Sequence, residues 1–404
     1  MTLIVQKFGG TSVGDPERIR RVAQRVAASA EAGNEICVVV SAMGKTTDEL
    51  VELATAVSDD PHPRELDMLL TAGEQISIAL LSMALWDLGR PAISFTGPQA
   101  GVVTDTTHGK ARIVEMRTDR VRAALDAGQI AIVAGFQGMS ADADITTLGR
   151  GGSDTTAVAI AAALEADACE IYTDVDGVYT ADPRIVPEAR KRAQVTYEEM
   201  LDLAANGARV LMLRSVEYAR NHGVPIHVRS SFTSEEGTWI VKEEDVLEQA
   251  IISGIAHDVG EAKITISGVP DRPGIAATVF RALADAQVNI DMIVQNVSEA
   301  GRATITFTLP EEDLRRAEPV LEQLKAELGA AEVLPDRDVA KVSLVGAGMR
   351  SNPGIAADMF DALAEAGINI EIISTSSIRI SCVVRVAEVE RAVRAVHERF
   401  RVLV

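Results

Sequence analysis

Short apolar runs alternate with helical patterns from the N-terminus to about residue 230. The run 36–40 is continuous, as in a strand buried on both faces of a sheet, and residues 16–32 have one apolar helical face. This alternation predicts an α/β fold with a mostly parallel sheet covered by helices on both faces. In such sheets, ligands bind beyond the carboxyl ends of the strands.

The turn after the first predicted strand has the chemistry of a phosphate site. Gly9 and Gly10 let the backbone approach a bulky anion because they carry no Cβ atom. Amides at the start of the following helix point at such an anion, and Lys7 can reach the same phosphates as a point charge. The alternative is that the two glycines only form a tight turn, which is common.

Three further polar turns with glycines lie at 41–48, 146–156 and 173–179. Two of them, like the turn after Lys7, come directly after apolar runs. The carboxyl ends of parallel strands meet at one rim, so we expect these turns to lie together. A Walker loop is excluded because Thr104 stands where its first glycine is needed, and Asp154 likewise breaks a dinucleotide fingerprint.

Composition restricts the cellular context. A chain of 404 residues predicts two or three domains, and a net charge of −20 argues against nucleic acid or an anionic membrane as a partner. Cys37, Cys169 and Cys382 are predicted to be buried thiols in a reducing compartment, and the six histidines show no metal-ligand spacing. With no signal peptide and no apolar run near the roughly 20 residues of a membrane span, we expect a cytoplasmic protein.

The chain after about residue 245 contains an internal duplication. The segment 263–268 recurs at 341–346, an offset of 78 residues; Pro273–Ala277 recurs at Pro353–Ala357, and Val288–Asp291 recurs as Ile368–Glu371, both at an offset of 80. Each copy reads as a βαββαβ module. One interpretation is that these modules only mediate dimerisation.

Together, the rim turns and the duplicated modules resemble the aspartate kinase (aspartokinase) family, whose members carry tandem C-terminal ACT domains. The resemblance covers essentially the whole chain. The motifs that carry it are Lys7-Phe8-Gly9-Gly10-Thr11-Ser12, Ser41-Ala42-Met43-Gly44, Gly73-Glu74, Gly149-Arg150-Gly151-Gly152-Ser153-Asp154 and Thr173-Asp174-Val175-Asp176-Gly177-Val178-Tyr179.

The resemblance implies a three-layer αβα amino-acid kinase (carbamate-kinase-like) domain over residues 1–245. Two ferredoxin-like ACT domains follow, the first over 263–340 and the second formed by 341–404 together with 246–262, with a strand supplied near residues 251–255. It also implies transfer of the γ-phosphoryl group of MgATP to the side-chain carboxylate of L-aspartate. This reaction is the first step of lysine, threonine and methionine biosynthesis.

The chemistry of that reaction can be matched to residues. Lys7 would bridge the transferred phosphoryl group beside the Gly9 and Gly10 amides, Arg150 has a planar fork for a carboxylate, and Glu74 is a counter-charge for the ammonium. By resemblance, Asp154 orients the catalytic groups and the hydroxyls of Thr47 and Ser153 position aspartate. By resemblance also, the nucleotide side is lined by Ser41, Thr173, Asp174, Tyr179 and Arg184. Mg²⁺ is expected to be held mainly by phosphate oxygens, and no protein metal ligand is assigned. Alternatively, Arg150 forms a surface ion pair, Glu74 is a solvated helix residue, and Tyr179 and Arg184 have structural roles.

The resemblance further implies that the ACT pair binds lysine, threonine or both as feedback inhibitors, and that ACT domains meet across chains in a homodimer or larger oligomer. The residues expected at the inhibitor site are Asp271, Gly274, Ala276, Ile290, Asp291 and Gln295 in the first copy, facing Asn369, Ile370, Thr375 and Ser376 of the second copy.

Two other functions remain open from the sequence. One is a different amino-acid kinase on the same fold, acting on glutamate, acetylglutamate or a nucleotide. The other is a catalytically silent amino-acid sensor. The ACT pair and the context of Arg150 and Glu74 argue against the first, and the intact Lys7, Glu74 and Asp154 argue against the second.

Overall fold

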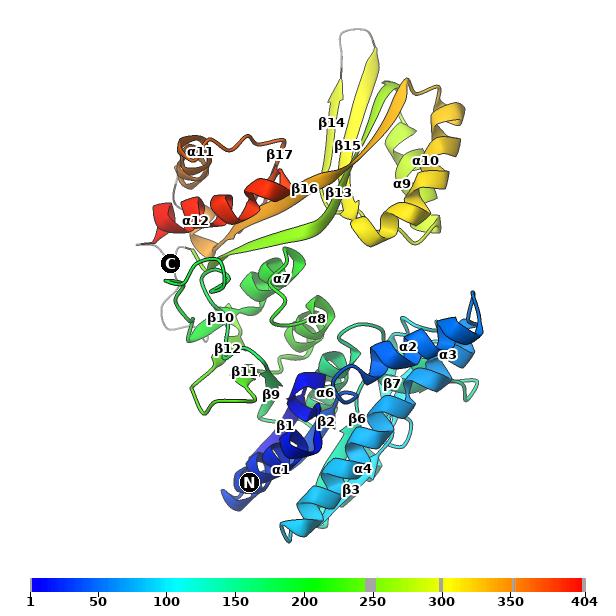
Figure 1. Ribbon diagram of the computed structural model, residues 1–404, viewed down its shortest axis with the longest axis vertical. Helices are drawn as coiled ribbons and strands as arrows, with labels where there is room; N and C mark the ends of the chain where they lie inside the picture. Colours follow the sequence, from blue (N-terminus) through cyan, green and yellow to red (C-terminus); the bar gives the residue numbers. More distant parts are fainter. Residues whose placement is uncertain (1, 244–251, 298–300, 351, 353, 402–404) are drawn as a thin grey trace. The chain divides into compact units, whose positions relative to one another are not determined.

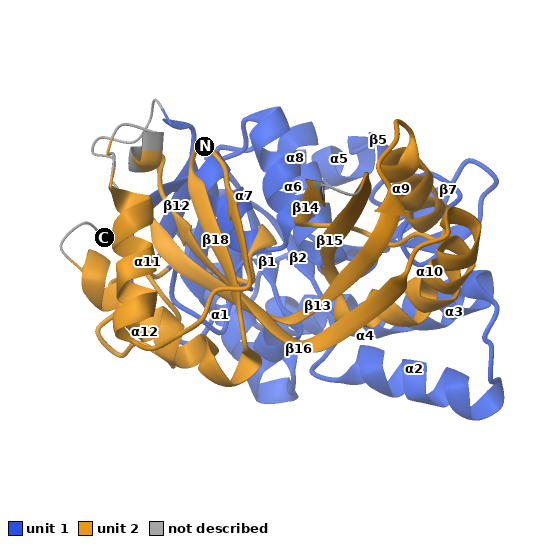
Figure 2. Ribbon diagram, turned by 90° about the horizontal axis from the view of Figure 1, so that it is seen from above, with its two compact units in different colours: residues 1–178, 191–204, 209–248 blue, residues 179–190, 205–208, 249–404 orange. Residues whose placement is uncertain are grey.

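The computed structural model describes residues 2–243, 252–297, 301–350, 352 and 354–401. It divides into two compact units (Figure 2). The first unit contains residues 1–178, 191–204 and 209–248, and the second contains residues 179–190, 205–208 and 249–404. Pro353, part of one repeated motif, and residues 246–251, part of the segment expected to join the second ACT domain, lie outside the described residues.

The main sheet of the first unit has eight strands in the order β10-β12-β11-β9-β1-β2-β6-β3. Every neighbouring pair is parallel except β11 with β12, which confirms the mostly parallel sheet expected from the sequence. The strands are β1 (Leu3–Phe8), β2 (Glu35–Val40), β3 (Ala92–Phe95), β6 (Ile130–Ala134), β9 (Ala168–Thr173), β10 (Gln194–Thr196), β11 (Ile226–Ser230) and β12 (Thr238–Val241).

Register brings three of the expected turns to one rim. Phe8 at the end of β1 pairs with Val40 of β2 on one side and with Tyr172 of β9 on the other. The three strands therefore end level with one another. The turns that follow them, at 9–12, 41–45 and 173–178, leave the sheet at the same edge.

Helices cover both faces of this sheet (Figure 1). Successive residues of a strand point to opposite faces. Phe8 packs in a core with α1 (Pro16–Glu31) and α4 (Ala72–Asp87), while Lys7 contacts α6 (Gly152–Ala163). The three-layer arrangement is thus confirmed. The other helices of the first unit are the 3₁₀ helix η1 (Gly10–Val13), α2 (Thr46–Val57), α3 (Pro63–Leu70), α5 (Asp119–Asp126), α7 (Tyr197–Ala205) and α8 (Leu213–His222).

Local signals in the sequence explain several helix boundaries. Asp15 caps α1 by accepting a hydrogen bond from the Arg18 amide at 2.8 Å, and Pro16 occupies the first helical position. Thr196 and Glu199 form the reciprocal hydrogen bonds of a capping box at 2.9 and 3.2 Å before α7.

The segment Pro63–Asp87 is long and apolar enough, by length and composition alone, to cross a membrane, contrary to the sequence expectation that no run approaches this length. In the first unit it forms α3 and α4, which are separated by Thr71. The buried carboxyl groups of Asp67 and Glu74 lie within it, and Leu81 and Leu85 pack in the core with α1. The segment is therefore a core element of this unit.

A smaller sheet stands beside these helices, with the strand order β5-β4-β7-β8. Its strands are β4 (Val102–Thr104), β5 (Ile113–Met116), β7 (Gln137–Ser140) and β8 (Ile145–Thr147). β4 and β5 are antiparallel. β8 leads through a short turn into α6.

The second unit contains one antiparallel sheet of six strands in the order β14-β15-β13-β16-β18-β17. Its strands are β13 (Gly254–Pro270), β14 (Ile293–Val297), β15 (Arg302–Pro310), β16 (Glu332–Val345), β17 (Ile372–Thr375) and β18 (Arg379–Val384). Its helices are α9 (Ile275–Asp285), α10 (Leu314–Leu328), α11 (Ile355–Glu365) and α12 (Val389–Phe400), with short 3₁₀ helices at Glu311–Asp313, Ala347–Arg350 and Val386–Glu388.

The two modules share the long central strands β13 and β16 (Figure 1). The first part of β13, residues 254–258, pairs with residues 341–345, which also pair with β18. The later part of β13 pairs with β15. Both expected domain boundaries, 262/263 and 340/341, therefore fall inside continuous strands.

Residues 179–190 pack in the second unit although they lie within the region expected to form the kinase domain. Ala181, Ile185 and Val186 belong to the core beneath α11 and α12. Thr180 Oγ1 lies 3.1 Å from His397 Nε2, and Arg394 Nε donates to the Ile185 carbonyl at 3.0 Å. Residues 179–190 are therefore part of the second unit because their apolar side chains are buried against α12.

Candidate active site

The rim of the main sheet brings Lys7 and Asp154 into contact. Lys7 Nζ lies 2.5 Å from Asp154 Oδ1, and the two side chains are only 11% and 10% exposed. Asp154 Oδ1 has no aligned hydrogen-bond donor among the described residues, so the contact is an ion pair. A cation at the end of β1 is thus held by the first turn of α6, and two separate sequence motifs form one cluster.

The glycine turn after β1 lies against the turn after β2. A Cβ atom on Gly10 would sit 2.8 Å from the Ala42 carbonyl oxygen, so this close approach requires glycine. The Gly44 amide donates to the Gly10 carbonyl at 3.0 Å, and the Ser41 amide donates to the Phe8 carbonyl at 3.1 Å. The turns that carry Gly9, Gly10 and Ser41 are therefore joined beside Lys7.

Hydroxyl groups extend this rim toward β9 and β11. Ser12 Oγ lies 2.5 Å from Ser231 Oγ, and the Ser231 amide donates to the Thr173 carbonyl at 2.9 Å. Thr173 Oγ1 donates to Asp174 Oδ1 at 3.1 Å, and Asp174 is exposed. The expected residues Ser41, Thr173 and Asp174 thus share the rim with Lys7.

Glu74 is a buried carboxylate with one oxygen unsatisfied. It lies in the first turn of α4 and is 3% exposed. Its Oε1 accepts a hydrogen bond from the Ala42 amide at 3.2 Å, while Oε2 has no donor among the described residues. Burial raises the pKa of Glu74 to about 7. Such a group favours a cation beside it, because a positive charge would restore the ionised form.

Close packing connects Glu74 to Lys7. A Cβ atom on Gly73 would lie 2.7 Å from Ala42 Cβ, so the start of α4 rests directly on the turn after β2. That same turn contacts Gly10, which follows Lys7. The segments that carry Glu74 and Lys7 therefore both pack against the turn after β2. The burial of Glu74 excludes the alternative of a solvated helix residue.

The remaining expected substrate residues surround the start of α6 and α2. Ser153 is 7% exposed in the first turn of α6, and Arg150 is exposed in the turn between β8 and α6. Thr47 is half-buried in the first turn of α2. Arg150 precedes Asp154 by four residues, so the contact of Asp154 with Lys7 keeps this turn at the same rim.

Two residues expected near the nucleotide belong to the second unit. Tyr179 and Arg184 lie in the segment 179–190, which packs with that unit. The guanidinium of Arg184 lies 2.7 Å from Asp182 Oδ2 and lowers the pKa of that carboxyl. Their roles at the nucleotide stay predictions.

The residues expected at the inhibitor site occupy two edges of the second unit's sheet. Gln295 lies on the edge strand β14, and Thr375 ends the opposite edge strand β17, with Ser376 next. Four strands separate these edges, which corresponds to roughly 20 Å or more. Gln295 and Thr375 of one chain are therefore too far apart to hold one amino acid between them.

The other expected inhibitor residues lie near the ends of these strands and helices. Gly274, with a φ of 99°, precedes α9, and Asp271 is exposed just before it. Asp291 and Asn369 are exposed, whereas Ala276, Ile290 and Ile370 are half-buried.

The second unit contains a reciprocal pair of lysines that the sequence reasoning missed. Lys341, which is 1% exposed, contacts Asp291 and lies 3.0 Å from Glu261 Oε1. Its counterpart in the repeat, Lys263, contacts Glu371, the counterpart of Asp291. Each module thus supplies a lysine to the other's carboxylate. The repeat offsets contained this signal, since both members of each pair recur.

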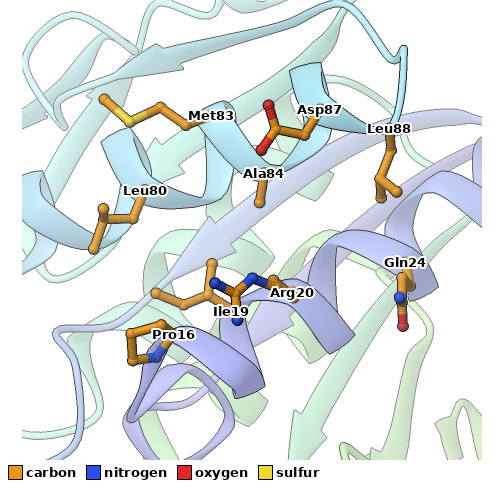
Figure 3. A pocket seen from close by; sticks show the side chains of 9 residues that line it. All are labelled: Pro16, Ile19, Arg20, Gln24, Leu80, Met83, Ala84, Asp87 and Leu88. Atoms are coloured by element: carbon orange, nitrogen blue, oxygen red, sulfur yellow. The ribbon is translucent and has the colours of Figure 1, made fainter.

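A groove between α1 and α4 lies outside this constellation (Figure 3). It has a volume of about 270 Å³. Arg20 on α1 and Asp87 on α4 are its charged side chains, and the rest of the lining is mostly apolar. None of the residues expected at the active site lines it.

Comparison with known proteins agrees with this architecture. The amino acid kinase family model matches residues 2–230, and ACT domain models match residues 264–329 and 342–400. The aspartokinases of Mycolicibacterium smegmatis and Corynebacterium glutamicum are 60% and 58% identical to this chain, with 99% of this chain and 96% of each relative covered.

Solved structures give the same result. The structure of E. coli aspartokinase III with aspartate and ADP in the R-state matches with a TM-score of 0.85 at 26% identity, covering 99% of this chain and 100% of that one. The T-state of the same enzyme with lysine and aspartate matches with a TM-score of 0.76 at 26% identity, covering 98% and 99%. By fold, domain content and full-length similarity, this chain belongs to the aspartokinase family.

Proposed function

We propose that this protein transfers the γ-phosphoryl group of MgATP to the side-chain carboxylate of L-aspartate, giving 4-phospho-L-aspartate. The observation that carries the proposal is the Lys7–Asp154 ion pair at the sheet rim, joined through the turn after β2 to the half-satisfied carboxylate of Glu74. A cation suited to phosphate and an anion suited to an ammonium group thus both lie in segments that pack against the turn after β2. The names of the close relatives support the same reaction.

The reaction requires positioning and charge neutralisation more than proton transfer. A carboxylate nucleophile is already ionised at neutral pH, so no strong general base is needed. Lys7 and the amides of Gly9 and Gly10 neutralise charge on the transferred phosphoryl group. Asp154 holds the Lys7 ammonium in place.

Aspartate is recognised by its charges in this proposal. Arg150 binds a carboxylate through its planar fork, and Glu74 binds the α-ammonium. The hydroxyls of Thr47 and Ser153 orient the substrate. Arg150 is exposed, whereas Glu74 is buried.

ATP binds along the rim formed by β1, β2 and β9. Ser41, Thr173 and Asp174 line this side, and we assign Tyr179 and Arg184 to it by family resemblance. Mg²⁺ neutralises the phosphates, and its ligands are mainly phosphate oxygens. The rim residues fit a magnesium ion held mainly by phosphates. Asp154 is already paired with Lys7, and Asp174 is an exposed carboxylate directly after β9.

The ACT modules supply feedback inhibition by lysine, threonine or both in this cytoplasmic enzyme, which starts lysine, threonine and methionine biosynthesis. The relevant relative is E. coli aspartokinase III, whose T-state was solved with lysine. Because β14 and β17 lie at opposite edges, Gln295 and Thr375 would face each other only across two chains. We therefore propose that the ACT modules join two or more chains in a homodimer or larger oligomer. The module boundaries expected from the sequence remain part of this proposal.

A substrate panel tests the proposed reaction. ADP release and hydroxamate formation are measured with aspartate, glutamate and acetylglutamate, and then with aspartate plus lysine, threonine or both. We expect turnover with aspartate and inhibition by at least one of the two amino acids. Preference for glutamate or acetylglutamate would assign another amino-acid kinase, and absence of any ATP turnover would indicate a sensor.

A further inference from the structure

A second buried carboxylate in the first unit lies outside the residues assigned so far. Asp67 in α3 is 1% exposed and accepts hydrogen bonds from two other segments. Thr147 Oγ1 donates to Oδ1 at 2.5 Å, and His108 Nδ1 lies 2.8 Å from Oδ2. The Gly109 amide lies 3.1 Å from both oxygens. These contacts compensate the desolvation of the charge.

The Asp67 side chain holds the segment that leads to Arg150. Thr147 is the last residue of β8, and the turn to α6 begins directly after it. The Ala111 amide donates to the Thr147 carbonyl at 2.9 Å. Arg214 bridges the same two chain segments. It donates to the Leu148 carbonyl at 3.1 Å and to the Ala111 carbonyl at 2.7 Å. Asp67 therefore anchors residues 108–111 and 147–148 together.

The Asp67 backbone is connected to the start of α4. Its carbonyl accepts a hydrogen bond from the Thr71 amide at 3.2 Å, and Thr71 is the residue between α3 and α4. The Thr71 carbonyl in turn accepts from Gln137 Nε2 at 3.1 Å. Glu74 follows three residues later. Asp67 thus links α3, which ends four residues before Glu74, to β8, which ends three residues before Arg150.

We propose that Asp67 is a positioning residue that sets the separation between Glu74 and Arg150, and so the fit of aspartate. The inference rests on the proposed function, in which these two groups bind the ammonium and a carboxylate of one substrate. A small shift between them weakens both contacts, and a displacement of about 1 Å can reduce a rate by 10²-fold. Lys7 and the glycine turn have no direct contact with Asp67 among the hydrogen bonds and ion pairs of the described residues, so we expect nucleotide binding to change less than aspartate binding.

The test compares the KM for aspartate with the KM for MgATP in the variant Asp67→Asn. The amide keeps the shape of the side chain but removes the charge and turns a donor toward at least one of the existing donors. We expect the KM for aspartate to rise about tenfold or more and the KM for MgATP to change by less than about twofold, because loss of the charged acceptor displaces the segment that carries Arg150.

Thr147 provides a second measurement with a matched pair of variants. Thr147→Val removes the hydroxyl donor at nearly constant shape, and Thr147→Ser restores it. The valine variant should raise the aspartate KM in the same direction, and the serine variant should return it toward wild type. If Asp67→Asn does not fold, the comparison of Thr147→Val with Thr147→Ser tests the inference instead.

Asp144→Asn is the control. Asp144 is also bonded to α3, through Arg64 Nε at 2.8 Å, but its side chain is 34% exposed. Both Michaelis constants should stay near the wild-type values. Equal changes in both constants for Asp67→Asn, or a lower melting temperature with unchanged kinetics, would overturn the inference. A wild-type enzyme inactive on aspartate would instead overturn the proposed function itself.

Discussion

Lys7 Nζ lies 2.5 Å from Asp154 Oδ1, and this ion pair joins the end of β1 to the first turn of α6. Both side chains are largely buried, so the attraction is screened less than it would be in water. The pair places a cation at the rim where β1, β2 and β9 end together.

Replacing Lys7 by alanine should lower kcat for aspartate phosphorylation by about 10²-fold or more, as loss of one preorganised donor typically does. Steady-state kinetics with an ADP-coupled assay would measure the change. Lys242→Ala is a suitable control, because Lys242 is an exposed lysine of the same unit and should leave kcat unchanged. A decrease of less than a few-fold for Lys7→Ala would contradict the role assigned to this ammonium.

Aspartate binding should release a proton from Glu74. Burial raises its pKa to about 7 in the free protein, so the carboxyl is largely protonated at about pH 6. The α-ammonium of bound aspartate favours the ionised form. Calorimetry at about pH 6 in buffers of different ionisation enthalpy should therefore detect nearly one proton released, and nearly none at about pH 8. Glu74→Gln should bind weakly and release none, whereas an unchanged proton count in that variant would exclude Glu74 as the source.

Glu74 should also make the stability of the first unit depend on pH. The folded state binds the proton more tightly than the unfolded state, whose pKa is near 4.5, so the free energy of unfolding falls as pH rises from about 4.5 to 7. The loss approaches about 3 kcal/mol above pH 7. Compared with wild type, Glu74→Gln should become relatively more stable over this range.

Tryptophan fluorescence during denaturant unfolding would measure this difference, because Trp86 and Trp239 both lie in the first unit. The informative quantity is the wild-type minus variant difference in unfolding free energy at pH 5 and pH 8. A difference that stays constant across this range would show that the Glu74 carboxyl titrates normally.

Substitution of Asp271 should separate inhibition from catalysis. Asp271 is exposed beside the Gly274 turn that opens α9. Asp271→Ala should raise the inhibitor concentration for half-inhibition by about tenfold or more, the effect of losing a charge-assisted hydrogen bond, and leave uninhibited kcat nearly unchanged. Asp285→Ala, at the exposed end of the same helix, should alter neither quantity. Parallel losses of turnover and inhibition in Asp271→Ala would make the modules structural.

The sequence by itself determined the α/β layers, the duplicated modules and the turn chemistry. These features are local or periodic: continuous apolar runs predict buried strands, and Asp15-Pro16 and Thr196 with Glu199 are local signals for a helix start. The motifs around Lys7 and Asp154 could be recognised separately for the same reason. Their contact arises from the packing of α6 against β1, which local patterns do not contain.

Only the tertiary structure decided which charges are buried and what they touch. The raised pKa of Glu74 depends on the close packing of Gly73 against Ala42. The hydrogen bonds that satisfy the Asp67 carboxylate come from donors about 40 and 80 residues away. The same holds for residues 179–190, whose apolar side chains pack beneath α12. Burial and hydrogen bonding between distant segments arise from the folded chain as a whole, so no short stretch of sequence specifies them.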